Sequence, residues 1–246
     1  MKRTLTLAAL TLPFATVATV AHAQDAPAVE AAEAAAEEGA TGPWEIDAEV
    51  GAHTDYRFRG ISLSGKNPEV TAEISVGHES GFYGAVWASN VLLDGVEADE
   101  VEVDLTAGWS KDVGSVNLDV GAVYYTYPGN GEFSYIELYA SAGYAIGDGE
   151  VRAGFAYAPS QDNIGDTSNR YYYVSFDMPL ADTPISAHGS FGIEDGAFGD
   201  KKRDWLIGAS FDLGRDFTAT LDYVDTARAY SSLGNATVVA RLTKSF

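Results

Sequence analysis

From residue 44 to residue 246, hydrophobic and polar residues alternate in short segments that turn-forming residues separate. In the first segment, Ile46 and Val50 share one parity, and Asp47 and Glu49 share the other. This period of two predicts β-strands with one apolar and one polar face. About twelve segments follow the pattern, at residues 44–58, 70–76, 82–89, 101–109, 116–124, 135–144, 151–157, 172–178, 185–193, 205–211, 217–223 and 235–246.

The connections between the predicted strands alternate in length. Short turns follow the even-numbered segments, and longer, more polar connections such as residues 60–68 and 194–203 follow the odd-numbered ones. An even number of antiparallel strands with this layout is typical of bacterial outer-membrane barrels. The sequence therefore predicts an all-β fold, a transmembrane antiparallel up-and-down β-barrel with both termini in the periplasm. Because no connection exceeds about a dozen residues, we expect none to fold deeply into the barrel.

Alternation alone does not say which face of the strands points outward. A soluble lipocalin-like barrel would bury its apolar face, whereas a membrane barrel presents that face to lipid. Aromatic residues lie at both ends of the apolar face, as membrane interfaces favour; Trp109, Tyr144 and Phe246 fall at the expected periplasmic end. A barrel of about twelve strands is also wider than wall side chains can fill. Both observations favour an apolar face toward lipid and a polar, watery lumen.

The N-terminal region differs from the rest of the chain. Residues 1–23 have the layout of a secretory signal peptide, with Lys2 and Arg3 before an apolar stretch and a small-residue site ending at Ala23. Residues 24–43 are rich in Ala and Glu and predict an acidic periplasmic tether. Residues 44–246 form the predicted barrel. The protein is thus expected in the outer membrane of a Gram-negative bacterium.

Composition narrows the classes of partner. The net charge of −21 disfavours nucleic acid, and the chain has no Cys with which to form disulfides. The expected partners are outer-membrane lipid and small solutes. A final strand that ends in Phe246 also resembles the signal that outer-membrane barrel assembly machinery reads. The sequence leaves the oligomeric state open.

Several stretches carry a resemblance to a known family. They are "TDYRFRGISLS" (54–64), "SGFYGAVWASNV" (80–91), "EVDLTAGW" (102–109), "VGAVYYTYPG" (120–129) and "SYIELYASAGY" (134–144). Together they resemble the TorF-type porin family of proteobacterial outer-membrane proteins. The resemblance implies an outer-membrane barrel and a channel. It supplies no substrate and no functional residue.

The polar face of the strands carries more acids than bases. The candidate pore-lining acids are Glu49, Glu73, Glu102, Asp104, Asp119 and Glu137, and the candidate pore-lining bases are Arg57, Arg152 and Arg241. In a water-filled lumen this excess of negative charge would concentrate cations. Alternatively, these groups hydrogen-bond one another across strands, and a dense network of pairs would plug the barrel.

Arg57 and Arg59 flank Phe58 near the expected external mouth. They could form a basic rung opposite acidic residues, or they could pair with carboxylates and hold the first loop against the wall. The second interpretation needs no further partner in the lumen, and we favour it.

An enzymatic function receives little support. His188 and Ser190 lie two residues apart on one strand face, as in outer-membrane phospholipases, which they resemble. Those enzymes turn the pair toward lipid, whereas here Ala187 and Phe191 occupy the lipid face. No orienting Asn or Asp is apparent in the expected place on the neighbouring segment 204–212. We expect no catalytic site, and no metal or cofactor motif is present.

These observations predict a channel for passive passage of small cationic or neutral solutes through an acidic lumen. The alternative is a closed structural barrel, or an adhesion or receptor barrel that acts through its external loops. The identity of the solute and the size of the pore are not encoded in any motif.

Overall fold

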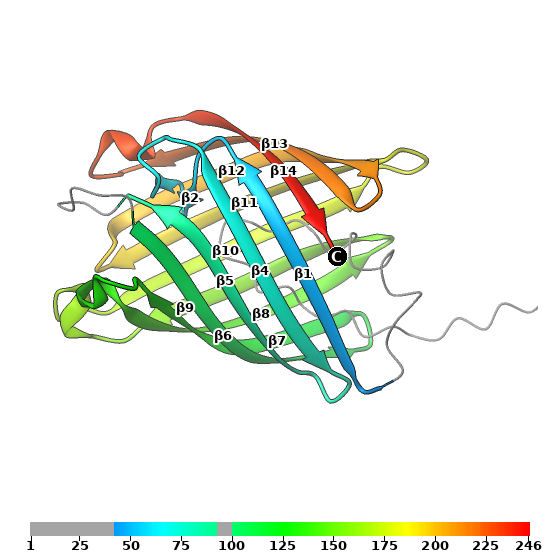
Figure 1. Ribbon diagram of the computed structural model, residues 1–246, viewed down its shortest axis with the longest axis horizontal. Helices are drawn as coiled ribbons and strands as arrows, with labels where there is room; N and C mark the ends of the chain where they lie inside the picture. Colours follow the sequence, from blue (N-terminus) through cyan, green and yellow to red (C-terminus); the bar gives the residue numbers. More distant parts are fainter. Residues whose placement is uncertain (1–41, 93–99) are drawn as a thin grey trace, which may run out of the picture.

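The computed structural model describes residues 42–92 and 100–246. The signal peptide and nearly all of the tether lie outside these residues, so both remain predictions. Twelve strands close into one antiparallel barrel (Figure 1). They are β1 (Trp44–His53), β4 (Glu69–His78), β5 (Phe82–Val91), β6 (Glu100–Val113), β7 (Val116–Thr126), β8 (Tyr135–Ile146), β9 (Gly149–Ala158), β10 (Asn169–Pro179), β11 (Ile185–Gly196), β12 (Gly199–Gly214), β13 (Phe217–Ala227) and β14 (Thr237–Ser245).

Short elements occupy the longer connections. A short hairpin lies between β1 and β4; its two strands, β2 (Arg57–Phe58) and β3 (Ile61–Ser62), have two residues each. Single turns of 3₁₀ helix follow β7, β9 and β13: η1 (Gly131–Phe133), η2 (Asp162–Ile164) and η3 (Ser232–Gly234). Among the described residues, no helix is long and apolar enough to cross a bilayer.

The last strand closes the sheet against the first. β14 pairs with β1 in the register Glu49↔Ser245 to His53↔Arg241. The backbone N–H of Phe246 continues the ladder by donating to the carbonyl of Ala48 at 2.9 Å. Closure leaves the barrel without a free edge, so the backbone polar groups of the wall are paired within it. The predicted closed, antiparallel barrel of about twelve strands is therefore confirmed.

Two predicted boundaries are wrong. The first strand was expected to reach residue 58, but β1 ends at His53 and the chain then leaves the wall. Residues 194–203 were expected to form a loop, but β11 and β12 extend through them and leave only Ala197 and Phe198 between the strands. In the first case the alternation of polar and apolar residues continues beyond the end of the strand, and in the second case the strands continue through a stretch of glycines and charged residues.

The apolar face of the strands points outward. Ile46 and Ile74 are 71% and 61% exposed, whereas the inward-facing Asp104 and Asp204 are fully buried. A soluble barrel would show the reverse arrangement. The face assignment made from the sequence is confirmed, and the outer surface is an apolar band of the kind that lipid covers.

The two ends of the barrel differ. One end, the turn end, holds the two-residue turns 114–115, 147–148 and 215–216 together with the first and last residues of the wall. The other, the loop end, holds the β2–β3 hairpin and the 3₁₀ turns. The side chains of Trp109, Tyr144 and Phe246 all lie on the outer face at the turn end, where Lys244 sits 4.7 Å from the ring of Phe246.

An outward-facing substitution tests the apolar band. Ile74 lies near the middle of β4, so Ile74→Lys should lower the free energy of unfolding in lipid vesicles by about 2–4 kcal/mol, because it places a charge in the apolar band. Denaturant titration of vesicle-refolded protein measures this. Glu79→Lys, in the exposed turn after the same strand, is the matched control and should have little effect. Equal effects of the two variants would contradict the outward assignment.

Candidate functional site

The connection between β1 and β4, residues 54–68, folds into the barrel; we call it the inner loop. A cluster of polar contacts around Asp55 holds it together. Asp55 accepts hydrogen bonds from Arg57 Nε at 2.6 Å, from Ser62 Oγ at 2.5 Å and from Ser64 Oγ at 3.0 Å. All four side chains are buried. The inner loop thus carries the partner of its own base into the lumen: the Asp55 carboxylate offsets the charge of Arg57 and also accepts hydrogen bonds from the two serines.

Arg59, at the turn of the hairpin, reaches strands far round the wall from β1 and β4. Its guanidinium donates to Glu137 of β8 and, at 2.8 Å, to Glu194 Oε1 of β11. It also lies 4.3 Å from the centre of the Tyr171 ring of β10, and its side chain is buried. In the order of strands around the barrel, β8 to β11 lie opposite the β1–β4 side. Arg59 therefore spans the lumen.

Lys202 of β12 completes this group of charges. Its ammonium donates to the backbone carbonyl of Arg59 and lies 2.9 Å from Glu194 Oε2 and 3.7 Å from Asp204 Oδ2. Asn169 of β10 adds a further hydrogen bond to Glu194 at 2.9 Å. We call Arg59, Glu137, Glu194 and Lys202 the crossing cluster. Because two bases face two acids directly, the charges of the cluster offset one another.

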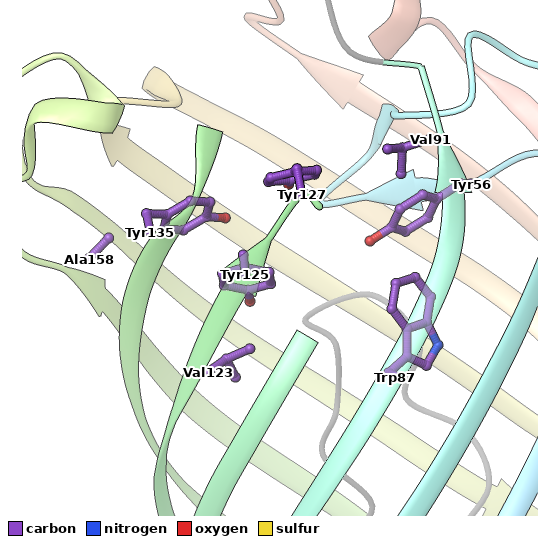
Figure 2. Packing of buried hydrophobic residues seen from close by; sticks show 8 residues of the cluster. All are labelled: Tyr56, Trp87, Val91, Val123, Tyr125, Tyr127, Tyr135 and Ala158. Atoms are coloured by element: carbon purple, nitrogen blue, oxygen red, sulfur yellow. The ribbon is translucent and has the colours of Figure 1, made fainter. Parts of the chain in front are cut away.

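An aromatic core packs beneath the inner loop (Figure 2). Tyr56 of the loop lies 5.5 Å from the Trp87 ring of β5, and Phe58 lies 5.8 Å from the Tyr125 ring of β7. Tyr125 in turn stacks on Tyr135 of β8 at 4.6 Å. These inward-facing rings fill the loop end of the lumen with apolar side chains. The watery lumen predicted from the sequence does not extend through this half of the barrel.

A second anchor ties the inner loop to the connection between β13 and β14. Arg57 Nη1 donates to the carbonyls of Leu233 at 2.8 Å and Asn235 at 3.2 Å.

The expectation that no connection folds deeply inward is therefore wrong. The loop is short, but its aromatic and charged side chains find partners on the far wall. The favoured interpretation of Arg57 and Arg59 holds in that both pair with carboxylates, but Arg59 does so across the lumen.

Charged side chains also meet at the base of the inner loop. Asp222 of β13 accepts from His188 Nε2 at 2.6 Å and from Arg241 Nη2 at 2.7 Å. His53 of β1 lies 3.1 Å from Glu69 of β4. His53, Glu69, Asp222 and Arg241 help to line a cavity of about 10 Å³, which is room for about one water molecule.

The turn-end half of the lumen is lined differently; we call it the vestibule. Besides the tyrosines Tyr83, Tyr139 and Tyr173, many inward-facing residues of its wall are small. They include Ser75, Ala85, Thr106, Gly121, Ser141, Ser190 and Ser210. The inward acids Glu45, Asp47, Glu49 and Glu73 are only half-buried there. The vestibule is thus the part of the lumen in which inward carboxylates keep some solvent exposure, whereas Ser75 and Thr106 of its wall are buried.

The predicted pore-lining residues divide between the two halves. Glu49, Glu73, Asp119 and Arg152 belong to the vestibule wall, and Glu102, Asp104 and Glu137 surround the inner loop. Arg57 lies in the inner loop rather than on the wall, and Arg241 lies between the halves.

Several of the predicted residues have polar partners among the described residues. Tyr127 donates to Glu102 at 3.0 Å, and Tyr83 donates to Asp119 at 2.7 Å. Lys202 and Glu194 were missed because they fall in the segment that the turn signals marked as a loop.

The His188 environment differs from a lipid-facing phospholipase pair. The His188 side chain is fully buried inside the barrel, and the hydroxyl within 3.5 Å of its Nδ1 belongs to Ser210, not to Ser190. Asp222, which orients the imidazole, comes from β13 rather than from the segment searched on sequence grounds. A buried histidine with a purely structural role also needs a hydrogen-bond partner, and the Asp222 carboxylate provides one.

Comparisons with known proteins place the chain in a family. Residues 37–246 match the family model described as "Bacterial protein of unknown function (Gcw_chp)". The chain belongs to this Gcw_chp family. No curated protein matches the sequence. The resemblance to TorF-type porins remains a prediction, because the matching family model carries no function.

Solved structures similar to this Gcw_chp protein share its fold at low sequence identity. The NanC porin is 10% identical with a TM-score of 0.53, covering 81% of this chain and 98% of its own. The KdgM porin is 8% identical with a TM-score of 0.54, covering 82% and 97%. A second KdgM structure, "in complex with disordered oligogalacturonate", is 9% identical with a TM-score of 0.54 and the same coverage.

Removing the charge of Arg59 tests the crossing cluster. Arg59→Met keeps the length of the side chain but leaves Glu137 and Glu194 with less buried counter-charge, so the free energy of unfolding should fall by about 3–5 kcal/mol. Amide hydrogen exchange across residues 54–68 should also rise, because the loop loses its far anchor. Lys66→Gln, at an exposed position of the same loop, should change neither quantity. Unchanged exchange in Arg59→Met would show that the loop is held by its other contacts, those of Arg57 and of the aromatic core, without the crossing cluster.

Proposed function

We propose that this Gcw_chp protein is an outer-membrane channel for small cationic or neutral solutes. Its acidic vestibule admits the solute, and its inner loop forms the constriction. Three observations support the membrane location: the exposed apolar band, the closed sheet without an edge, and a fold shared with the NanC and KdgM porins. The signal-peptide layout of residues 1–23 and the aromatic end at Phe246 are consistent with export and assembly into that membrane.

The observation that carries the proposal is the division of the lumen. A barrel that served only as a membrane anchor would gain by filling its whole interior, yet here the filling stops half-way. Part of the filler in the loop-end half is a connection rather than a wall strand, and this part can move without opening the sheet. Half-buried carboxylates, including Glu49 and Glu73, remain in the other half. Fixed negative charge in a solvent-accessible lumen concentrates cations and repels anions.

The competing function is a closed barrel that acts through its loop end. The aromatic core around Tyr56 and Tyr125 and the narrow cavity beside Asp222 favour it, because they block the direct path. The two functions differ in one measurable property. A channel carries discrete current steps in a planar bilayer, whereas a closed barrel carries none.

Single-channel recording under a salt gradient tests the channel and its charge preference together. We expect small steps with a cation-directed reversal potential, and a larger unit conductance for Arg59→Met because the inner loop loses an anchor. The double variant Glu49→Gln/Glu73→Gln should move the reversal potential toward zero, since it removes two vestibule charges. Glu132→Gln, on the exposed η1 turn at the other end of the barrel, is the matched control.

Each outcome of this recording has a defined meaning. An anion-directed reversal potential would refute the acidic selectivity while keeping the channel. Silence from folded wild-type protein and from folded Arg59→Met would refute the channel and leave the closed barrel.

A further inference from the structure

Two inward-facing tyrosines, Tyr139 and Tyr173, pack against glycines of neighbouring strands. A Cβ added to Gly154 of β9 would lie 2.2 to 2.4 Å from three atoms of the Tyr173 side chain of β10. A Cβ on Gly121 of β7 would lie 2.3 Å from Oη and 2.5 Å from Cζ of Tyr139 of β8. No side chain other than hydrogen fits beneath either phenol group. Each glycine therefore makes room for a phenol group against the wall; Tyr173 also stacks on Tyr171 with ring centroids 5.8 Å apart, and Tyr139 packs against the aromatic core.

Solvent access distinguishes these two tyrosines from others with the same seat. Tyr83 lies on Gly108 and Tyr171 lies on Gly192 in the same manner, but both are buried. Tyr139 and Tyr173 are half-buried, on inward-facing positions of β8 and β10. The strand register places Tyr173 at the level of Ser141, two residues along β8 from Tyr139, so the rings are staggered by roughly 7 Å along the strands.

Polar groups surround the two rings in a fixed arrangement. Arg152 of β9 donates to Ser141 Oγ at 2.8 Å and to Asn117 Oδ1 at 3.0 Å. Its guanidinium also binds Glu150 through two hydrogen bonds, at 2.8 and 3.0 Å, so the positive charge is offset locally. Asp119 lies next to Tyr139 through the shared contact of both with Tyr83. The rings are thus bordered by donors and acceptors with no net positive charge.

We infer that Tyr139 and Tyr173 form a saccharide-binding surface in the vestibule, one that takes neutral and aminated sugars in preference to acidic ones. A sugar ring has an apolar C–H face and a rim of hydroxyls. The electron-rich face of a tyrosine suits the first, and carboxylate, amide and guanidinium groups suit the second. Binding sites for small polar molecules combine such apolar surface with a few placed polar groups. An amino group gains further from the ring face and from the nearby acids.

The charge of the vestibule sets the expected preference. Glu49, Glu73, Glu150 and Asp119 all belong to this half of the wall, whereas its base Arg152 is already paired with Glu150. A sugar acid would bring a carboxylate toward this surface and be repelled. The inference rests on the proposed channel for its biological use, but binding itself does not require conduction. Binding and conduction can therefore be measured separately.

Calorimetric titration of the refolded full-length mature protein in detergent tests binding without conduction. The probes are maltotriose, chitosan trimer and galacturonate trimer. We expect saturable binding of the first two and weaker binding of the third. The double variant Tyr139→Leu/Tyr173→Leu should weaken binding about tenfold, because it removes two aromatic ring faces. Phe at both positions should restore most of it, since the ring faces remain.

Matched controls separate stacking from folding. Tyr172→Leu removes a tyrosine of the same strand that faces outward and is 52% exposed, and it should leave binding unchanged. If the double Leu variant fails to fold, nitration of wild-type tyrosines followed by mass spectrometry replaces it. Maltotriose should protect Tyr139 and Tyr173 from nitration but not Tyr230, which lies in the β13–β14 connection and is 76% exposed.

Three results would overturn the surface: no saturable binding to folded wild-type protein, equal protection of Tyr230, or tighter binding of galacturonate than of maltotriose. Planar-bilayer recording on the same preparation keeps the two proposals apart. Current steps without sugar binding reject the surface and keep the channel, whereas sugar binding without current steps keeps the surface and rejects the channel.

Discussion

A barrel of twelve strands encloses more space than its wall side chains can fill, and the rest of this structure responds to that constraint. The sheet must close, because every backbone polar group in an apolar surround needs a partner within the protein. Closure in turn fixes the width of the interior. The loop-end half is filled by the inner loop and by large inward aromatics such as Trp87 and Tyr125, whereas the turn-end half carries small residues and stays accessible.

The crossing cluster shows how charge can enter such an interior. Burying a single Arg would cost several kcal/mol, but Arg59 arrives between two carboxylates and stacks on Tyr171. A planar guanidinium can bridge two acids from different strands, which a lysine ammonium does less well because its charge is compact and strongly hydrated. Glu137 and Glu194 together carry two negative charges; Arg59 offsets one of them and Lys202 offsets the other. The cluster gives the loop one position rather than many.

Much of the wall could be predicted from the sequence, because period-two alternation directly encodes which face of each strand meets lipid. The inner loop could not, and Tyr56 shows why. Thr54, Tyr56 and Phe58 continue the alternation of β1, so local pattern alone extended the strand beyond His53. The charges did contain a signal: the inward acids Glu137 and Glu194 carry two negative charges, and Lys202 supplies only one positive charge. Deciding that Arg59 supplies it requires knowing which strands lie opposite, and only the closed fold gives this.

In the proposed channel, the same charge balance would couple opening of the barrel to its selectivity. With the inner loop in place, Arg57 and Arg59 offset part of the negative charge around them, since Arg57 pairs with Asp55 of the loop and Arg59 pairs with Glu137 and Glu194. Movement of the loop out of the lumen would remove Asp55 together with both arginines and leave Glu102, Asp104, Glu137, Glu194 and Asp204 on the wall with Lys202. The constriction would then become more acidic as it widens. A lumen that gains negative charge on opening concentrates cations only when it can pass them.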